Sequence, residues 1–309
     1  MSHPNILVYT INSFNFTCGG LVVQYELCKI IDSLGINIRI RAPENIDNSI
    51  FSKYYKNDFD LNNTLVIYGE TIQGNPLNAP YVMRWILAPL GIIVNKDIYK
   101  TWGPKDLVYF FNSDKIFSKN ESMIGTKYKL LTCVYLNPLI KNHNNPIRKG
   151  YCHTFRKSQY HKSLRYAHPP NSQELKREHK LVDCINIFNK RKIFISYDPL
   201  TFLNIIAAIC GCVSVIIKVD GINTHEEWLK TTGVASYVKN KGITKLYGIA
   251  YGISEISWAN ETLHLVRQQL NDILEYCKTQ TILPFLKDIE DLNNLENAEN
   301  TIQKIFLDN

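Results

Sequence analysis

One acidic residue and one pair of basic residues stand where they could act on a phosphorylated substrate. Arg156 and Lys157 directly follow the short apolar segment of residues 151–155. Two such cations can neutralise the charge on a departing diphosphate, Arg by bidentate contact and Lys as a point charge. Glu70 lies just after the apolar run of residues 64–68, where a carboxylate can take a proton from a nucleophile. The alternatives are a solvated basic loop and a carboxylate that is solvated or caps a neighbour.

A second group of candidate residues surrounds the turn after the apolar segment 192–197. Asp198 is a favoured N-cap residue and Pro199 a favoured first helical residue, so we expect a helix to begin at Pro199. The free amides and the dipole at such a helix start favour phosphate, and Thr201 can add a hydroxyl. Asp198 is either a cap alone or, together with Tyr197, a contact for ribose or sugar hydroxyls.

Two glycines and two further charged residues complete the candidate set. Gly19 and Gly20 stand where a first strand turns into a helix, and they allow a ligand to approach the backbone closely. The dinucleotide fingerprint G-x-G-x-x-G is absent there, which argues against NAD. Glu255 lies near a predicted helix start, where the helix dipole favours it with or without a ligand. Arg84 lies within an apolar strand and needs a partner, for which Glu70 is one candidate.

Strands and helices alternate along the chain. A buried strand at 5–10, a helix with 3.6-residue periodicity that Gly35 ends, and an alternating strand at 36–40 form one Rossmann-like unit. The runs at 192–197 and 212–217 are almost continuously apolar, as in a parallel sheet that is buried on both faces. Further strands are predicted at 64–68, 81–87, 107–111 and 130–135, and helices at 174–188 and 254–278.

Bulk properties exclude several classes of protein. The chain has 309 residues, which suits two α/β domains, and the Asn- and Pro-rich segment 137–150 is predicted as their linker. No apolar run reaches the roughly 18 residues of a membrane span, and the N-terminus has no signal pattern. The eight cysteines lack zinc-site spacing, so we expect a reducing compartment, no disulfide and no metal. A net charge of +7 is mild for a nucleic-acid binder. The basic aromatic stretch 148–166 nevertheless keeps an RNA-binding protein as one alternative.

Several of these segments together resemble a group of GT-B glycosyltransferases from bacterial polysaccharide clusters and giant viruses. The resemblance covers roughly residues 5 to 270, and the same group carries an Arg-Lys pair at the place of Arg156 and Lys157. Its motifs are Ser196–Thr201 with Ala207-Ala208 and Cys210–Cys212, Tyr68–Thr71 with Gly74–Leu77 and Val82–Trp85, and Tyr247–Thr262.

The resemblance implies an α/β protein of GT-B type, with two Rossmann-like parallel-sheet domains that face a cleft. Residues 1–145 would hold a glycan or other acceptor, residues 150–280 would bind a nucleotide sugar, and helices in 281–309 would pack back on the first domain. Transfer of a hexosyl or related group would need no metal, no cofactor beyond the donor and no nucleic acid. We expect a cytoplasmic location, in the host cytoplasm if the protein is viral.

The resemblance also distributes roles among the candidate residues. The catalytic residues would be Glu70, Arg156 and Lys157, and the donor-binding residues Gly19, Gly20, Tyr197, Asp198, Thr201 and Glu255. A catalytically inactive glycosyltransferase-like protein that binds glycans or nucleotides is the main alternative.

Overall fold

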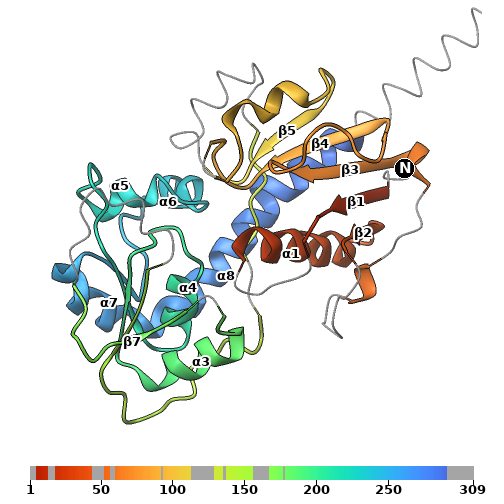
Figure 1. Cartoon of the computed structure of the whole chain (residues 1–309). Helices are drawn as coiled ribbons and strands as arrows, with labels where there is room; N and C mark the ends of the chain where they lie inside the picture. The colour runs from red at the N-terminus through yellow and green to blue at the C-terminus, as the bar shows by residue number, and fades with distance from the viewer. Residues whose placement is uncertain are drawn as a thin grey trace, which may run out of the picture. The chain divides into compact units, whose positions relative to one another are not determined.

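The computed structural model describes residues 5–12, 18–43, 52–55, 60–91, 93–112, 129–134, 137–155, 167–176 and 178–290. The chain divides into two compact units, each built on a five-stranded parallel sheet with helices beside it (Figure 1). The first unit comprises Met1–Phe14, Gly20–Val134 and Glu275–Asn309, and the second comprises Asn15–Gly19 and Tyr135–Leu274. The α/β class with two parallel sheets is thereby confirmed.

The sheet of the first unit has the order β2-β1-β3-β4-β5. Its strands are β1 (Asn5–Tyr9), β2 (Ile38–Arg41), β3 (Thr64–Gly69), β4 (Tyr81–Ile86) and β5 (Leu107–Phe110). All six residues of β3 are buried, as its continuous apolar run predicts for a central parallel strand. Helix α1 (Gly19–Ser33) begins at the paired glycines, and Gly35 follows it with a φ of +80°. Both helix boundaries agree with the sequence pattern. Short 3₁₀ turns are η1 (Ser52–Tyr54), η2 (Leu61–Asn63) and η3 (Lys96–Thr101).

The far end of the described chain also belongs to the first unit. Helix α8 (Val266–Cys277) belongs to the second unit as far as Leu274, and it continues through the π-helical segment η7 (Lys278–Ile282) into a helix over 283–290 of the first unit. The Thr281 hydroxyl accepts a hydrogen bond from the Thr132 amide at 3.2 Å. The Tyr109 hydroxyl donates to Asp288 at 2.6 Å, and the Phe285 ring lies edge-on to the Tyr109 ring. Residues from both ends of the sequence therefore build this unit.

The sheet of the second unit has the order β10-β9-β8-β6-β7. Its strands are β6 (Tyr151–Thr154), β7 (Gln173–Glu174), β8 (Ile193–Ser196), β9 (Val213–Ile216) and β10 (Ile249–Tyr251). Its helices are α3 (Leu181–Lys190), α4 (Leu203–Ile209), α5 (His225–Leu229), α6 (Ala235–Lys241) and α7 (Ile256–Thr262), with 3₁₀ turns η5 (Ile253–Glu255) and η6 (Leu263–Leu265). The buried side chains of β8, β9 and α7 share one hydrophobic core, which includes Tyr197 and Ala259.

Both sheets have the same topology. When the strands of each unit are numbered as they occur, the order is 2-1-3-4-5 in both. The direction of winding reverses between β1 and β3 in the first unit and between β6 and β8 in the second. Open parallel sheets bind ligands beyond the carboxyl ends of the strands at such reversals. The topology therefore marks one candidate site in each unit.

Two predicted helices differ from those in the structure. The helix expected over 174–188 begins only at Leu181, because the Asp183 carboxylate accepts the Lys180 amide at 3.0 Å and fixes the helix start there. The helix expected over 254–278 is divided into η5, α7, η6 and α8. Near its break the Thr262 hydroxyl bonds back to the Trp258 carbonyl at 2.8 Å, a contact that bends helices.

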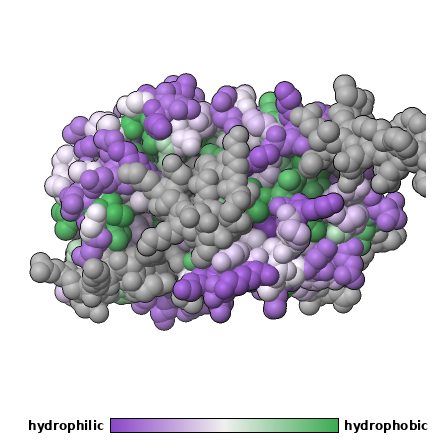
Figure 2. Space-filling view, turned by 90° about the horizontal axis from the view of Figure 1, so that it is seen from above, coloured by the Kyte–Doolittle hydropathy of each residue, from purple (hydrophilic) through white to green (hydrophobic). Residues whose placement is uncertain are grey.

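The segment predicted as a linker, 137–150, has neither helix nor strand and is bound to the second unit. The Arg148 guanidinium donates to the carbonyls of Phe188 and Cys210, each at 2.7 Å. All eight cysteines fall within the described residues, and all are free thiols. No helix in the described ranges is long and apolar enough to cross a membrane. On the face drawn in Figure 2, hydrophobic residues form separate small patches among hydrophilic ones.

Candidate functional site

Glu70 lies at the carboxyl end of β3, beside the reversal point of the first sheet. Its side chain is buried, and its Oε2 accepts a hydrogen bond from the Leu87 amide at 3.0 Å. Burial raises the pKa of Glu70, against a smaller opposing effect of the amides of Leu87, Glu70 and Ala88. A carboxylate that is held in place and has a raised pKa suits proton abstraction near neutral pH.

The start of α1 lies beside the same strand ends. A Cβ atom added to Gly20 would stand 3.5 Å from the side chain of Leu87, the residue whose amide holds Glu70. A Cβ on Gly19 would meet nothing within 4 Å, and this glycine is exposed. The structure thus brings Gly20 and Glu70 to one end of the first sheet, with open space at the first residue of α1.

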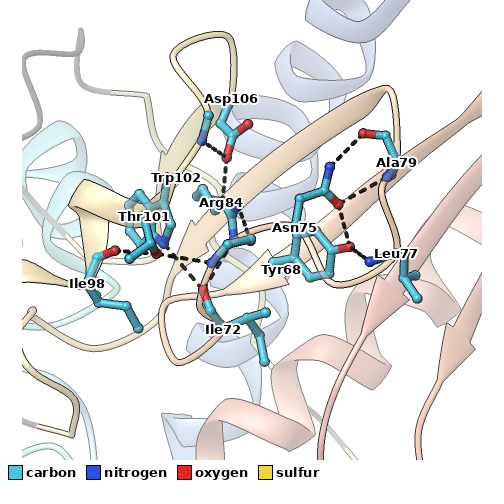
Figure 3. A network of polar contacts seen from close by, with 12 residues as sticks. Tyr68, Ile72, Asn75, Leu77, Ala79, Arg84, Ile98, Thr101, Trp102 and Asp106 are labelled. Carbon is cyan, nitrogen blue, oxygen red and sulfur yellow. Dashed lines mark hydrogen bonds and ion pairs between the residues drawn. The ribbon is translucent and has the colours of Figure 1, made fainter.

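The partner of Arg84 is Asp106 and not Glu70, which corrects the pairing considered from the sequence. The guanidinium is fully buried and lies 2.7 Å from the Asp106 carboxylate (Figure 3). It also donates to the carbonyls of Ile72 and Gly74, at 3.3 and 2.6 Å. Asp106 lies 22 positions further along the chain, so the local pattern around Arg84 could not reveal it. Glu70 is thereby free of an ion pair with Arg84.

Further contacts around Arg84 fix the loop that follows Glu70. The Tyr68 hydroxyl donates to the Asn75 side chain at 3.0 Å, and Asn75 in turn bonds to both backbone groups of Ala79 (Figure 3). The Tyr68 ring also lies 4.9 Å from the Arg84 guanidinium, a cation–π contact. The segment between β3 and β4 is therefore a packed loop, and it supports the backbone on which Glu70 sits.

In the second unit, Tyr197 lies in the core beside the reversal point. Its ring stacks on Phe155 at 4.9 Å, and its hydroxyl accepts from the Ala167 amide at 2.6 Å. The Tyr197 side chain is fully buried, so it supports the turn rather than presenting a ring to a ligand. Arg156 and Lys157 come directly after Phe155 in the sequence and lie outside the described residues.

The turn after β8 differs from the expected helix start. Helix α4 begins at Leu203 rather than Pro199, because the buried Asp198 carboxylate accepts the Leu200 amide at 2.9 Å and closes a turn first. Asn204 and Ser196 both donate to the Asp198 carbonyl and fix this turn. Thr201 precedes the helix, and its partly exposed hydroxyl accepts weakly from the Leu203 amide at 3.4 Å.

Glu255 is part of a polar cluster at the carboxyl end of β10, which is separated from β8 by β9 in the sheet order. Its Oε2 lies 2.7 Å from Nδ1 of His225, and its Oε1 lies 3.0 Å from the Lys245 ammonium. Burial alone would raise the pKa of Glu255, but the Tyr251 amide, His225 and Lys245 outweigh it and lower the pKa. His225 was missed in the sequence because it stands 30 positions from Glu255, with no local signal.

Three histidines of the second unit lead us to expect that its stability falls in acid. Nε2 of His225 accepts the Leu246 amide at 3.2 Å, so this ring is neutral, and burial lowers its pKa. The rings of His153 and His168 stack at 3.7 Å, and burial lowers the pKa of both. Unfolding lets each ring take up a proton more readily. We therefore expect the melting temperature to fall as the pH drops below about 6.5, with a further share from Glu255 below about 4.3.

Melting curves between pH 8 and pH 4 check this expectation. His225→Gln should reduce the dependence on pH, whereas the same change at the exposed His264 should leave it intact. A melting temperature that stays constant from pH 7 to pH 5 in the wild-type protein would contradict it.

Comparisons with known proteins support the fold. No family model and none of the curated proteins matches the sequence. A solved structure of sucrose-phosphate synthase from Thermosynechococcus elongatus is similar, with a TM-score of 0.51 and 9% sequence identity, over 96% of this chain and 100% of that one. The likeness shows that the chain shares the fold of that protein, with two α/β units. Within the described ranges no cluster of three or more His, Cys, Asp or Glu side chains could hold a metal ion.

Proposed function

We propose that the protein is a glycosyltransferase that moves a sugar from a nucleotide-sugar donor to a glycan or another hydroxyl-bearing acceptor. One observation carries the proposal. The winding of the strands reverses between β1 and β3 in the first unit and between β6 and β8 in the second, and open parallel sheets bind ligands at such points. Candidate residues from the sequence follow these strands, with Glu70 after β3 and Asp198 after β8. The glycosyltransferase-like fold supports the same reaction class.

The second unit would bind the donor. The partly exposed Thr201 and the backbone around the start of α4 offer hydrogen bonds to phosphate, while the charged Glu255 carboxylate can accept from ribose hydroxyls. Asp198 and Tyr197 would support this turn from beneath, since both are buried. Arg156 and Lys157 follow β6 in the sequence and would stabilise the diphosphate as it departs.

The first unit would bind the acceptor. Glu70 would take the proton of the acceptor hydroxyl in an inverting transfer. The acceptor oxygen forms its bond to the anomeric carbon while the bond from that carbon to the diphosphate breaks, so the diphosphate leaves with the electron pair. Because protein cations would balance the leaving group, we propose that transfer needs no metal and persists in excess chelator.

A thermal-shift screen of the purified protein tests the proposal. Nucleoside diphosphates and nucleotide sugars should stabilise the protein, by about 2.7 kcal/mol at 100 times the dissociation constant, and slow donor hydrolysis should accompany binding. Binding without hydrolysis or transfer would identify a catalytically inactive relative. Affinity that depends on phosphate number and falls steeply with salt, without preference for one nucleotide, would indicate an RNA-binding protein instead.

A further inference from the structure

A buried amide oxygen that has no hydrogen-bond partner among the described residues lies on α1, in a side chain that approaches Gly69. Gln24 is in the second turn of α1 and is 6% exposed. Within the described part of the chain its Oε1 accepts no hydrogen bond. Buried polar groups are nearly always paired, so an unpaired amide in a core position requires an explanation.

The position of Gln24 connects it to the candidate acceptor site. Its Nε2 lies 3.4 Å from where a Cβ on Gly69 would stand, and Glu70 is the next residue. Gly20, one turn earlier in α1, adjoins the Leu87 side chain, while the Leu87 amide holds Glu70. The first turns of α1 and the ends of β3 and β4 therefore place the amide of Gln24 and the carboxylate of Glu70 at one end of the sheet.

We propose that Gln24 binds hydroxyl groups of the acceptor sugar and orients one of them toward Glu70, an inference that rests on the proposed function. A primary amide offers one acceptor oxygen and two N–H donors. Neighbouring sugar hydroxyls both donate and accept, so they satisfy the amide and still leave a donor for the carboxylate. A nucleobase edge can also pair with an amide, but it offers no further hydroxyl proton for Glu70 to remove.

A second glutamine provides a matched control. Gln269 in α8 is also 6% exposed, but its Oε1 accepts the Tyr247 amide at 2.9 Å. Gln269→Met would leave that amide unpaired, and we expect it to lower the melting temperature without changing ligand binding. Gln24→Met removes an amide whose oxygen lacks a partner within the described ranges, so we expect the melting temperature to stay equal or rise.

Binding of saccharides and of nucleotides to these variants tests the inference. A panel of glucose, galactose, mannose, N-acetylglucosamine and their disaccharides would be titrated by calorimetry into the wild-type protein, Gln24→Met and Gln24→Leu. We expect the dissociation constant of the preferred saccharide to rise by about tenfold or more in both Gln24 variants, and to be unchanged in Gln269→Met. A wild-type protein that binds no saccharide, or Gln24 variants that bind it equally well, would overturn the inference.

Titration of nucleoside diphosphates separates this inference from the proposed function. We expect them to bind the wild-type protein and all three variants with the same affinity. Saccharide binding that depends on Gln24, without any nucleotide binding, would reject the glycosyltransferase and retain the sugar site. A nucleotide whose affinity falls in the Gln24 variants while saccharides do not bind would assign Gln24 to a nucleobase and reject the sugar site.

Discussion

Replacement of Glu70 by Gln should slow glycosyl transfer by about 10²–10⁴-fold, the usual contribution of a general base. The amide is almost the same size and can still accept the Leu87 amide, so the loop should keep its structure. Because the folded protein raises the pKa of Glu70, the charged carboxylate opposes folding at neutral pH. Glu70→Gln should therefore melt at the same temperature as the wild type or higher, and bind nucleotides normally.

Glu26 provides the control for this substitution. It is equally buried in α1 of the same unit, and burial raises its pKa as well, yet its Oε1 pairs with Lys29 rather than with the end of a strand. Glu26→Gln should leave the transfer rate unchanged. As the pH is lowered, the wild-type rate should begin to fall while the pH is still above the ordinary glutamate pKa of about 4.3. Only the charged form of Glu70 acts as a base, and its raised pKa means that it is protonated earlier. A fully active Glu70→Gln variant would exclude the proposed role.

Arg84→Ala should destabilise the first unit by about 3–5 kcal/mol, as is typical when one partner of a buried ion pair is removed. The substitution removes the cation that pairs with the Asp106 carboxylate, which is 10% exposed and keeps only the Gly103 amide as a donor among the described residues. The Ile72 carbonyl keeps the Trp102 ring N–H, and the Gly74 carbonyl loses its bond to the guanidinium. Arg84→Lys should recover only part of the loss, because an ammonium cannot reach these acceptors with the geometry of a guanidinium. Denaturant unfolding followed by tryptophan fluorescence measures the effect.

The exposed pair of Lys100 and Asp97 serves as the comparison for Arg84. Both side chains are largely in solvent, so Lys100→Ala should cost less than about 1 kcal/mol. If Arg84→Ala proves too unstable to purify, Arg84→Lys still gives a measurable shift. An Arg84→Ala protein within about 1 kcal/mol of the wild type would show that the network in Figure 3 contributes little to stability.

Much of the fold could be predicted because its signals are local. The apolar runs that become β3, β8 and β9 are buried on both faces, so their composition alone identifies parallel strands. Glycines mark both ends of α1. Gly19 and Gly20 begin the helix, and Gly35 follows its end with a positive φ, a conformation that favours glycine. The order in which these strands pair, and with it the position of each reversal point, comes from the structure and was not predicted.

Side-chain contacts that override a local pattern, and contacts between distant parts of the chain, could not be predicted from single segments. The Asp198-Pro199 pattern favours a helix start, but Ser196 and Asn204 bind the backbone of Asp198 and impose a separate turn before α4. The contact between His225 and Glu255 was not predicted either, because the two residues are 30 positions apart. Arg84 shows the same limit, because Glu70 was its candidate partner from the sequence and the folded chain supplies Asp106.

The discontinuous first unit has a consequence for synthesis of the protein. Tyr109 and Thr132 form hydrogen bonds to Asp288 and Thr281, which follow the second unit in the sequence. A ribosome thus releases the second unit nearly complete while the five strands of the first still lack the helix that covers Tyr109. The earlier-made half of the protein is therefore the later one to finish folding, because this helix is synthesised only after the second unit.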